Sequence, residues 1–484
     1  MKRFLSIVGS VLTAAVILCG CDANVENEYQ YIRLDVANVS FAAEKNSPVE
    51  ISVTAPGKWT VEPSASWIKI DDQTDNSVTV SVEDNDTEDE RIGTLTFTMG
   101  AAVEEVTVNQ LPKVGTDYIY RYPVQFDLGA VMSPNGKYVG GQIPILNDDE
   151  TWTHQIIIID VDADEQNIVA EVPASLFGIE KPYCISDTGL FFIMNNQGGT
   201  VAYDLDGNYM VPTAPADCLP GVDIQCVSSD GRIYAGMAYR ASDSFYLPMK
   251  WVDGVPEVLP MPEKNYRDSV WVTGIIPRGM SEDGSVIYGS SWDNNDFGMC
   301  YWDKNGDFHW VGEDARELDF AVNDYGFGEV TENIVNGMTC TAELTNMSPN
   351  GRWIAGTWRK EITAPGVGQP GGGSTCAAFY DTENHKTYIF EGEGSGGTTC
   401  TNDGLGFTTN GLGANGGNVI DIENGVVLGS VSEWIQDTYG ITPGPGFIVQ
   451  LSPDKSRILS MCLAADAAVG MRTTHWFIAP APER

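Results

Sequence analysis

A four-residue corner that recurs along the last three quarters of the chain constrains the fold more than any other sequence feature. It reads Ser, any residue, Asn or Asp, then Gly, and a short apolar strand follows it, as in Met280–Gly289. Four copies match this pattern fully, at Ser133, Ser228, Ser281 and Ser348, and the copy at Ser186 has Thr in the third place. Two further copies are imperfect, at Thr401 and Ser452. Successive copies lie 53, 42, 53, 67, 53 and 51 residues apart, so seven units fill residues 116–484.

Each corner has a physical reason to form a tight turn between two strands. Gly after Asn or Asp supplies the positive φ of a hairpin turn, and the Ser hydroxyl can bond a nearby backbone amide. A glycine after the next strand, as at Gly236, allows neighbouring backbones to approach closely. A second turn lies about half a repeat later in most units, where Asp follows an apolar or aromatic residue: Asp160, Asp204, Asp253, Asp303, Asp381 and Asp421.

Two hairpins per unit make four strands per unit, which is the blade of a β-propeller. The pattern therefore predicts an all-β fold with a seven-bladed β-propeller over residues 116–484. The last unit lacks a partner for its second hairpin. We predict that Tyr118–Phe126 completes this blade and closes the ring, since an open ring would leave an unpaired edge.

Residues 33–112 show a different pattern of short strands with alternating apolar and polar residues, which predicts a two-sheet β-sandwich. Its motifs, in order, resemble the BACON domain family: Trp59-Thr60-Val61, Trp67-Ile68, Arg91-Ile92-Gly93 and Val106–Gln110. The resemblance implies an Ig-like sandwich of a kind often appended to exported glycan-processing proteins of gut bacteria. Trp59 and Trp67 are candidate sugar-stacking platforms; the alternative is that they belong to the sandwich core.

The first 21 residues have the pattern of an export signal. Lys2 and Arg3 precede an apolar run, Phe4–Leu18, that is too short to span a bilayer. The ending Leu18-Cys19-Gly20-Cys21 resembles the lipobox of bacterial lipoproteins. That resemblance implies that residues 1–20 are removed and that Cys21 carries a lipid, with residues 21–32 as a tether. It also implies that the protein lies in the bacterial cell envelope, anchored in the outer membrane. An ordinary secretory peptide cut nearby is the alternative.

The chain carries 67 acidic and 27 basic residues, a net charge of −40. Nucleic acid is excluded as a partner, because phosphate binding needs a basic surface. The carboxylates either solvate the exterior or form cation sites, and Asp160, Asp162 and Asp164 are candidate calcium ligands. The same three residues in a hairpin turn can simply solvate its tip.

No cofactor and no catalytic residue is predicted. The four histidines form no ligand pair, and neither a Gly-x-Ser-x-Gly elbow nor a phosphate-binding loop occurs. Eight cysteines follow Cys21 without a Cys-x-x-Cys pair, so a zinc knuckle is not expected. They could form disulfides in an exported chain or remain buried thiols.

We interpret the chain as an exported, lipid-anchored binding protein. One face of its propeller binds a glycan or a protein, and the sandwich serves as a spacer or an auxiliary glycan-binding module. The alternatives are a propeller hydrolase or lyase acting on polysaccharide, and a structural scaffold. Clustered inward carboxylates with shifted pKa values in the central depression would favour an enzyme. Exposed aromatic side chains on one face would favour a glycan-binding protein, and the absence of both features would favour a scaffold.

Overall fold

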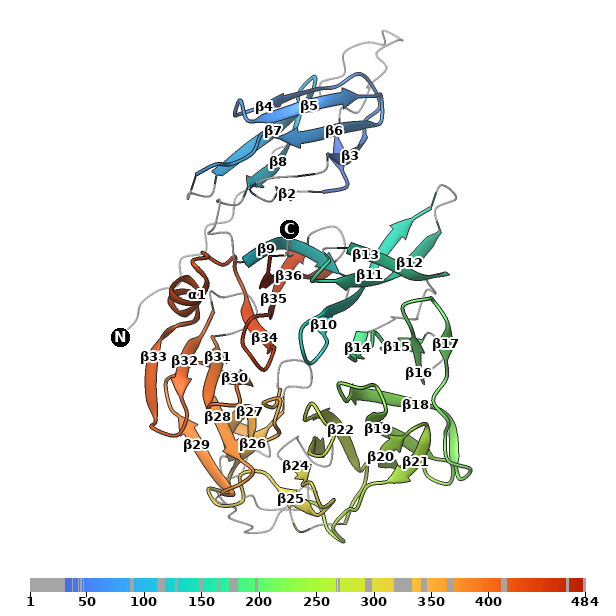
Figure 1. The fold of residues 1–484 in the computed structure, drawn as a ribbon, viewed down its shortest axis with the longest axis vertical. Coiled ribbons are helices and arrows are strands. Elements are labelled where there is room, and N and C mark those ends of the chain that lie inside the picture. The colour runs from blue at the N-terminus through green and yellow to red at the C-terminus, as the bar shows by residue number, and fades with distance from the viewer. Residues whose placement is uncertain are drawn as a thin grey trace, which may run out of the picture. The chain divides into compact units, whose positions relative to one another are not determined.

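The computed structural model describes residues 31–481 except 37, 42, 44–45, 47, 88–90, 111–117, 127–128, 148–150, 164, 174–181, 196–198, 267, 269, 292–297, 317–332, 341–345, 364–369, 411–415 and 467–469. The chain folds into two compact units, one mainly from residues 46–83 and 92–109 and one mainly from residues 110–484 (Figure 1). The predicted signal segment, including Cys21, lies outside the described residues.

The first unit is a β-sandwich of two four-stranded sheets. One sheet has the order β1–β3–β6–β5, with strands Arg33–Leu34, Val49–Thr54, Ser77–Val82 and Ile68–Gln73. The other has the order β2–β8–β7–β4, with strands Asn38–Phe41, Ala102–Gln110, Arg91–Met99 and Thr60–Pro63. Period-two alternation puts one face of each strand inside, so that Leu95 and Phe97 of β7 are fully buried.

The second unit contains seven four-stranded antiparallel sheets among its described residues, and Figure 1 shows them arranged in a ring. In six sheets the four strands are consecutive in the chain and lie side by side in that order. The first sheet comprises β10 (Ala130–Met132), β11 (Tyr138–Leu146), β12 (Trp152–Asp160) and β13 (Glu165–Pro173). The second comprises β14 (Pro182–Ile185), β15 (Phe191–Asn195), β16 (Gly199–Tyr203) and β17 (Tyr209–Met210). The third comprises β18 (Cys218–Val227), β19 (Ile233–Arg240), β20 (Tyr246–Val252) and β21 (Val255–Val258).

The remaining sheets continue around the ring. The fourth sheet comprises β22 (Ile275–Met280), β23 (Ile287–Ser291), β24 (Met299–Trp302) and β25 (Phe308–Trp310), and the fifth comprises β26 (Asn333–Thr339), β27 (Trp353–Thr363), β28 (Pro370–Asp381) and β29 (Lys386–Phe390). The sixth comprises β30 (Gly396–Cys400), β31 (Leu405–Thr409), β32 (Asn418–Asp421) and β33 (Val426–Ser430). The last contains β34 (Phe447–Leu451), β35 (Ile458–Asp466) and β36 (Gly470–Pro480). One helix, α1 (Val431–Tyr439), follows β33; it begins with a capping box between Ser430 and Glu433.

The last sheet is completed by the first strand of the unit. β9 (Tyr118–Phe126) pairs antiparallel with β36, with Tyr120 opposite Ile478 and Phe126 opposite Thr473. The buried ring of Tyr120 lies 6.1 Å from that of Trp476. The predicted closure by residues 118–126 is confirmed, and it joins the two ends of the repeat in one sheet.

The corners form the predicted turns. In the fourth copy the Ser281 hydroxyl donates to the Asp283 carboxylate at 2.7 Å and accepts from the amide of Val286 at 2.9 Å, while Gly284 has φ 71°. Every copy makes the equivalent pair of bonds through its buried hydroxyl: Ser133, Ser186, Ser228, Ser281, Ser348, Thr401 and Ser452. The worn copy at Thr401 is therefore a structural equivalent of the others.

The half-repeat aspartates also cap turns. Asp204 accepts from the amides of Asp206 and Asn208, and its side-chain bond with Asn208 lowers the pKa of the carboxyl below its usual value. Four others accept amides two to four residues further on: Asp160, Asp303, Asp381 and Asp421. Asp253 instead forms a bidentate ion pair with Arg232.

Each corner also bonds to the next one around the ring. Corners two to five are joined by backbone hydrogen bonds between their second residues: Asp187 N–H to Ser229 O at 2.9 Å, Ser229 N–H to Glu282 O at 2.7 Å and Glu282 N–H to Pro349 O at 2.7 Å. The corners therefore form a continuous belt of turns, which we call the corner belt.

Proline at the second position changes how the corner belt is linked. Pro134 and Pro349 have no N–H, and the following residue donates instead: Asn135 to the Asp187 carboxylate, and Asn350 to the side chain of Asn402. Lys455 of the seventh corner forms an ion pair with Asp403 of the sixth, and Arg457, just after the seventh corner, pairs with Asp162 in the β12–β13 turn of the first sheet.

Candidate ligand-binding cavity in the ring of sheets

One cavity of about 180 Å³ lies where the innermost strands of the ring converge. Its wall comes from β10, β14, β18, β22, β30 and β34, and from residues Asn346 and Met347 just before the fifth corner. All seven sheets therefore contribute to one site. Each innermost strand adds side chains from a different part of the chain to one concave site, which is the kind of site that binds small ligands.

A β-bulge recurs on the innermost strands, three residues before the corner. The register shifts on β14, β18, β22, β30 and β34, where one residue is skipped in the pairing with the next strand. The five skipped residues are Tyr183, Gln225, Arg278, Thr398 and Val449. A bulge bends the strand and re-aims the side chain of the extra residue, and four of these five line the cavity.

Two of the glycines predicted to allow close backbone approach lie beside these bulges. A Cβ at Gly236 of β19 would meet the carbonyl oxygen of Asp223 at 1.8 Å, and one at Gly289 of β23 would meet that of Ile276 at 2.7 Å. Only glycine allows the bulged strand to approach this closely. The repeated glycine therefore sets the shape of the cavity wall in the third and fourth sheets.

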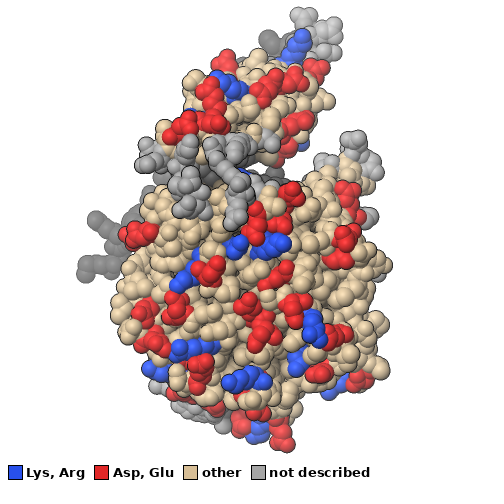
Figure 2. Space-filling model, in the orientation of Figure 1, with Lys and Arg blue, Asp and Glu red and all other residues tan. Residues whose placement is uncertain are grey.

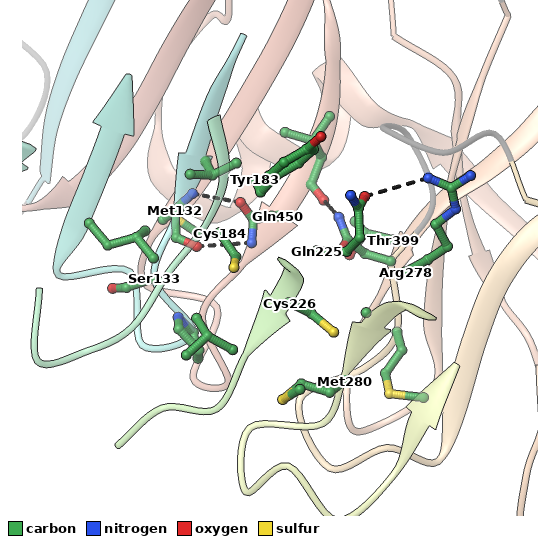
Figure 3. A pocket seen from close by; sticks show the side chains of 18 of the residues that line it. Met132, Ser133, Tyr183, Cys184, Gln225, Cys226, Arg278, Met280, Thr399 and Gln450 are labelled. Atoms are coloured by element: carbon green, nitrogen blue, oxygen red, sulfur yellow. Dashed lines mark hydrogen bonds between the residues drawn. The ribbon is translucent and has the colours of Figure 1, made fainter. Parts of the chain in front are cut away.

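Three large polar side chains sit at the bulges of adjacent sheets, and we call them the polar arc: Tyr183, Gln225 and Arg278. Figure 3 shows Gln225 and Arg278 pointing toward each other, with Tyr183 nearby on the same side of the cavity. Nη1 of Arg278 lies 3.5 Å from Oε1 of Gln225, and its Nε lies 3.3 Å from Oγ of Ser290. The arc thus spans the second, third and fourth sheets with three kinds of hydrogen-bonding group.

An ionisable pair lies beside the arc on the third sheet. The hydroxyl of Tyr239 donates to the Asp223 carboxylate at 2.8 Å. Burial raises the pKa of Asp223 above its usual value, although the Tyr239 hydroxyl and the charge of Arg278 act in the opposite direction. Burial and the Asp223 charge also raise the pKa of Tyr239. This is the kind of pair with shifted pKa values that functional sites contain.

Other polar residues of the cavity hold its walls together. Gln450 accepts from the backbone N–H of Met132 at 2.6 Å and donates to its carbonyl at 3.0 Å, which fastens the last sheet to the first (Figure 3). Asn346 donates to the carbonyl of Val449 at 2.6 Å. Glu282 lies at the corner belt, where burial and then the charges of Asp187 and Asp283 raise the pKa of its carboxyl.

The two tryptophans proposed as sugar platforms have structural contacts in the sandwich. Trp59 is buried, its ring lies 5.7 Å from that of Phe97, and its indole N–H donates to the Asp75 carbonyl at 2.8 Å. Trp67 is half-buried and packs over Gly93, where a Cβ would lie 3.2 Å from the indole ring. The core interpretation therefore applies to Trp59, which presents no ring face to solvent.

The candidate calcium ligands have other partners. Asp160 accepts from the amides of Asp162 and Ala163, each at 3.1 Å, and Asp162 pairs with Arg457 at 2.6 Å. Asp164 lies outside the described residues. Among the described residues no cluster of three or more His, Cys, Asp or Glu side chains could hold a metal ion. The two described aspartates thus serve a turn and the closure of the ring.

Outside the cavity, the surface charges, the cysteines and the exposed aromatic side chains of the described residues show no second binding site. Figure 2 shows acidic side chains spread over the visible faces, interspersed with Lys and Arg. All eight described cysteines are free thiols. Tyr31 and Tyr209 are the exposed aromatic side chains in the part of the chain that the structure describes. In that same part, no helix is both long and apolar enough to cross a membrane.

The fold and the cavity together define an all-β protein in which a sandwich domain precedes a β-propeller-like repeat unit. The BACON family, described as "Putative binding domain, N-terminal", matches residues 57–111. Residues 57–111 therefore match the family that the sequence motifs resemble. A comparison with curated proteins finds no match.

Solved structures similar to this chain include several propellers. The β-propeller domain of the trilobed protease from Pyrococcus furiosus, which has an open velcro topology, is 11% identical; the match covers 73% of this chain and 93% of that one, with a TM-score of 0.40. TolB from Acinetobacter baumannii is 14% identical over 72% of this chain and 83% of its own, with a TM-score of 0.28. A Bacteroides ovatus GH5 xyloglucanase in complex with a XXXG heptasaccharide is 23% identical over 25% and 29%, with a TM-score of 0.16.

The polar arc was missed by the sequence analysis. A signal for it existed, because Tyr183, Gln225 and Arg278 each stand three residues before a corner serine. Aligning the copies on that serine would have shown one position that carries Ala, Tyr, Gln, Arg, Thr, Thr and Val in turn. The extra backbone residue that aims this position into the cavity depends on strand register, which a local pattern does not specify.

Proposed function

We propose that the protein is an exported, lipid-anchored binding protein that holds part of a glycan in the central cavity of its repeat unit. The observation that carries the proposal is the polar arc, where Tyr183, Gln225 and Arg278 from three adjacent sheets line one cavity. Hydroxyl, amide and guanidinium groups are the partners that sugar hydroxyl and carboxylate oxygens require.

The size of the cavity limits the part of a ligand that it can enclose. A volume of about 180 Å³ admits a small group. A chain end or a single sugar unit fits such a space. Since Trp59 belongs to the core of the sandwich, the sandwich acts in this proposal as a spacer between the lipid anchor and the binding unit.

The test is a glycan array probed with residues 22–484, with and without residues 22–112. Binding to defined oligosaccharides by both forms is expected, together with loss of binding in Gln225→Ala. Binding that requires residues 22–112 would move the site to the sandwich. Absence of binding to every polysaccharide and oligosaccharide tested would reject a glycan-binding function.

A polysaccharide-cleaving enzyme is the second candidate, and the Asp223–Tyr239 pair is the observation that favours it. A carboxyl and a phenol with raised pKa values, 2.8 Å apart, can act in general acid–base catalysis. Incubation of the protein with each polysaccharide that it binds, followed by analysis of chain length, separates the two functions. Products that disappear in Asp223→Asn would identify an enzyme.

A further inference from the structure

Arg278 holds a distinct place in the cavity. It is the bulged residue of β22, and its guanidinium reaches from the fourth sheet toward Gln225 of the third. The bulge and the adjoining Gly289 fix its backbone, since a Cβ at Gly289 would meet the Ile276 carbonyl at 2.7 Å. A side chain placed by a bulge and held by neighbouring oxygens is pre-organised for binding.

The charge of the cavity is also specific. Among the described residues that line it, Arg278 is the single Lys or Arg, and Glu282 at the corner belt is the single Asp or Glu. The whole chain carries 67 acidic and 27 basic residues. The acidic exterior does not attract an anion. A negatively charged ligand would therefore need a cation inside the cavity in order to bind.

We propose that the ligand of the cavity carries a single carboxylate, as a uronic acid unit of a glycan does, and that Arg278 binds this carboxylate; the inference rests on the proposed glycan-binding function. A guanidinium is planar and offers parallel N–H groups that match a carboxylate. Gln225 and Tyr183, on the next two sheets, then face hydroxyl groups of the same or the adjoining sugar.

The arrangement fits a carboxylate better than a phosphate. A phosphate group carries a charge of about −1.5 to −2 at neutral pH and calls for several donors or cations. The described wall of the cavity supplies one cation, Arg278, and also one carboxyl group, Glu282. A single guanidinium therefore suits the single charge of a carboxylate better than the larger charge of a phosphate.

Titration calorimetry on residues 22–484 tests the inference. The probes are oligosaccharides of galacturonate, glucuronate and mannuronate, each beside its carboxyl-reduced neutral counterpart. At least one acidic oligosaccharide is expected to bind, and its reduced counterpart to bind at least tenfold more weakly. Arg278→Gln is expected to weaken the acidic probe at least tenfold and to leave the neutral probe unchanged. Added salt is expected to weaken the acidic probe in the wild-type protein.

Two further variants control for folding and for charge. Arg232→Gln makes the same chemical change at an exposed residue just after the third corner, where Arg232 pairs with Asp253 of the outer hairpin, and it is expected to bind like the wild type. Arg278→Lys keeps the charge but loses the planar fork, and an intermediate affinity is expected. Unfolding midpoints in urea verify that all variants are folded.

The outcomes separate the inference from the proposed function. Equal binding of an acidic probe and its neutral counterpart, or unchanged binding by Arg278→Gln, overturns the role of the carboxylate while leaving glycan binding intact. If neutral glycans of the array bind and none of the three acidic probes does, the inference again fails alone. If no glycan of any kind binds, both fail together.

Discussion

The corner serine is a residue whose small side chain organises a whole turn. The hydroxyl of Ser281 is buried, accepts the Val286 amide and donates to Asp283. The same two bonds recur at the corner residue of each of the seven copies, so the local geometry does not depend on the sequence of the flanking strands. The turn follows from the side chains of four residues, which explains why it can be predicted from sequence.

Ser281→Ala should destabilise the repeat unit by about 1–3 kcal/mol, because the partly buried Val286 amide and the Asp283 carboxylate each lose a partner. Urea unfolding measures the change. The matched control is Ser242→Ala on an exposed turn, for which a change within about 0.5 kcal/mol is expected. Equal effects of the two substitutions would contradict this role of the hydroxyl.

His475 should make stability depend on pH. Its Nδ1 donates to the Ser460 carbonyl at 2.7 Å, and burial lowers the pKa of the imidazole from 6.5 to about 4. Between these two values the unfolded chain binds more protons than the folded one, so stability falls as the pH falls. The loss from pH 7 to pH 5 should be about 2 kcal/mol.

Urea unfolding at pH 7 and pH 5 checks this expectation. In His475→Gln the part of the pH dependence that belongs to this histidine should be absent, whatever the stability of the variant at pH 7. The control is His385→Asn, since His385 is exposed and Asn tolerates its φ of 52°. A wild-type pH slope retained by His475→Gln would show that other groups cause it.

The limits of sequence reasoning are clear at the scale of single residues. Ser281 and Gly284 could be predicted because a turn is local. The position of Arg278 in the cavity could not, because it depends on one skipped residue in the pairing of β22 with β23. Trp59 and Trp67 were ambiguous for another reason: an aromatic ring suits a core and a sugar platform equally well, and only burial decides between them.

At the scale of elements, the bulged innermost strand and the strand beside it work as a pair. The bulge on β18 places Gln225 toward the cavity, and Gly236 on β19 makes room for the bent backbone. The backbone of Gly236 packs tightly against the Asp223 carbonyl, on the same strand as Gln225. The shape of the site therefore depends on a residue that has no side chain of its own.

Gly236→Ala should disrupt the polar arc. The new methyl group would lie 1.8 Å from the Asp223 carbonyl oxygen, so β18 must shift and carry Gln225 and Asp223 with it. We expect a destabilisation of about 1–3 kcal/mol and weaker glycan binding, measured by urea unfolding and calorimetry. Gly57→Ala, where the nearest atom is 3.7 Å away, is the matched control. Unchanged binding in Gly236→Ala would show that the bulge does not position the arc.

The pairing of β9 with β36 shows how elements from opposite ends of the repeat determine its closure. β36 would be an edge strand without β9, and exposed edges invite association with other chains. The Arg457–Asp162 ion pair and the Gln450–Met132 hydrogen bonds then join this last sheet to the first. Closure therefore rests on the β9–β36 pairing within the last sheet and on two contacts between the last sheet and the first.

At the scale of the whole molecule, the proposed export and lipid anchor rest on the N-terminal sequence. Two basic residues, Lys2 and Arg3, precede the apolar run Phe4–Leu18. The binding unit needs no membrane contact in this arrangement. Its location would be set entirely by the lipid on Cys21.

Cys21→Ser should abolish lipid attachment. Cells grown with labelled palmitate are expected to incorporate the label into the wild-type protein, and mass spectrometry should find Cys21 as the acylated first residue. The control is Cys19→Ser, two residues earlier, which should still be labelled because Cys19 leaves with residues 1–20. Since stable anchoring takes more than one acyl chain, the measured mass also shows how firmly the protein is held. Label retained by Cys21→Ser would show that another residue is acylated, and an unlabelled wild-type protein whose mature chain begins elsewhere would be a freely secreted one.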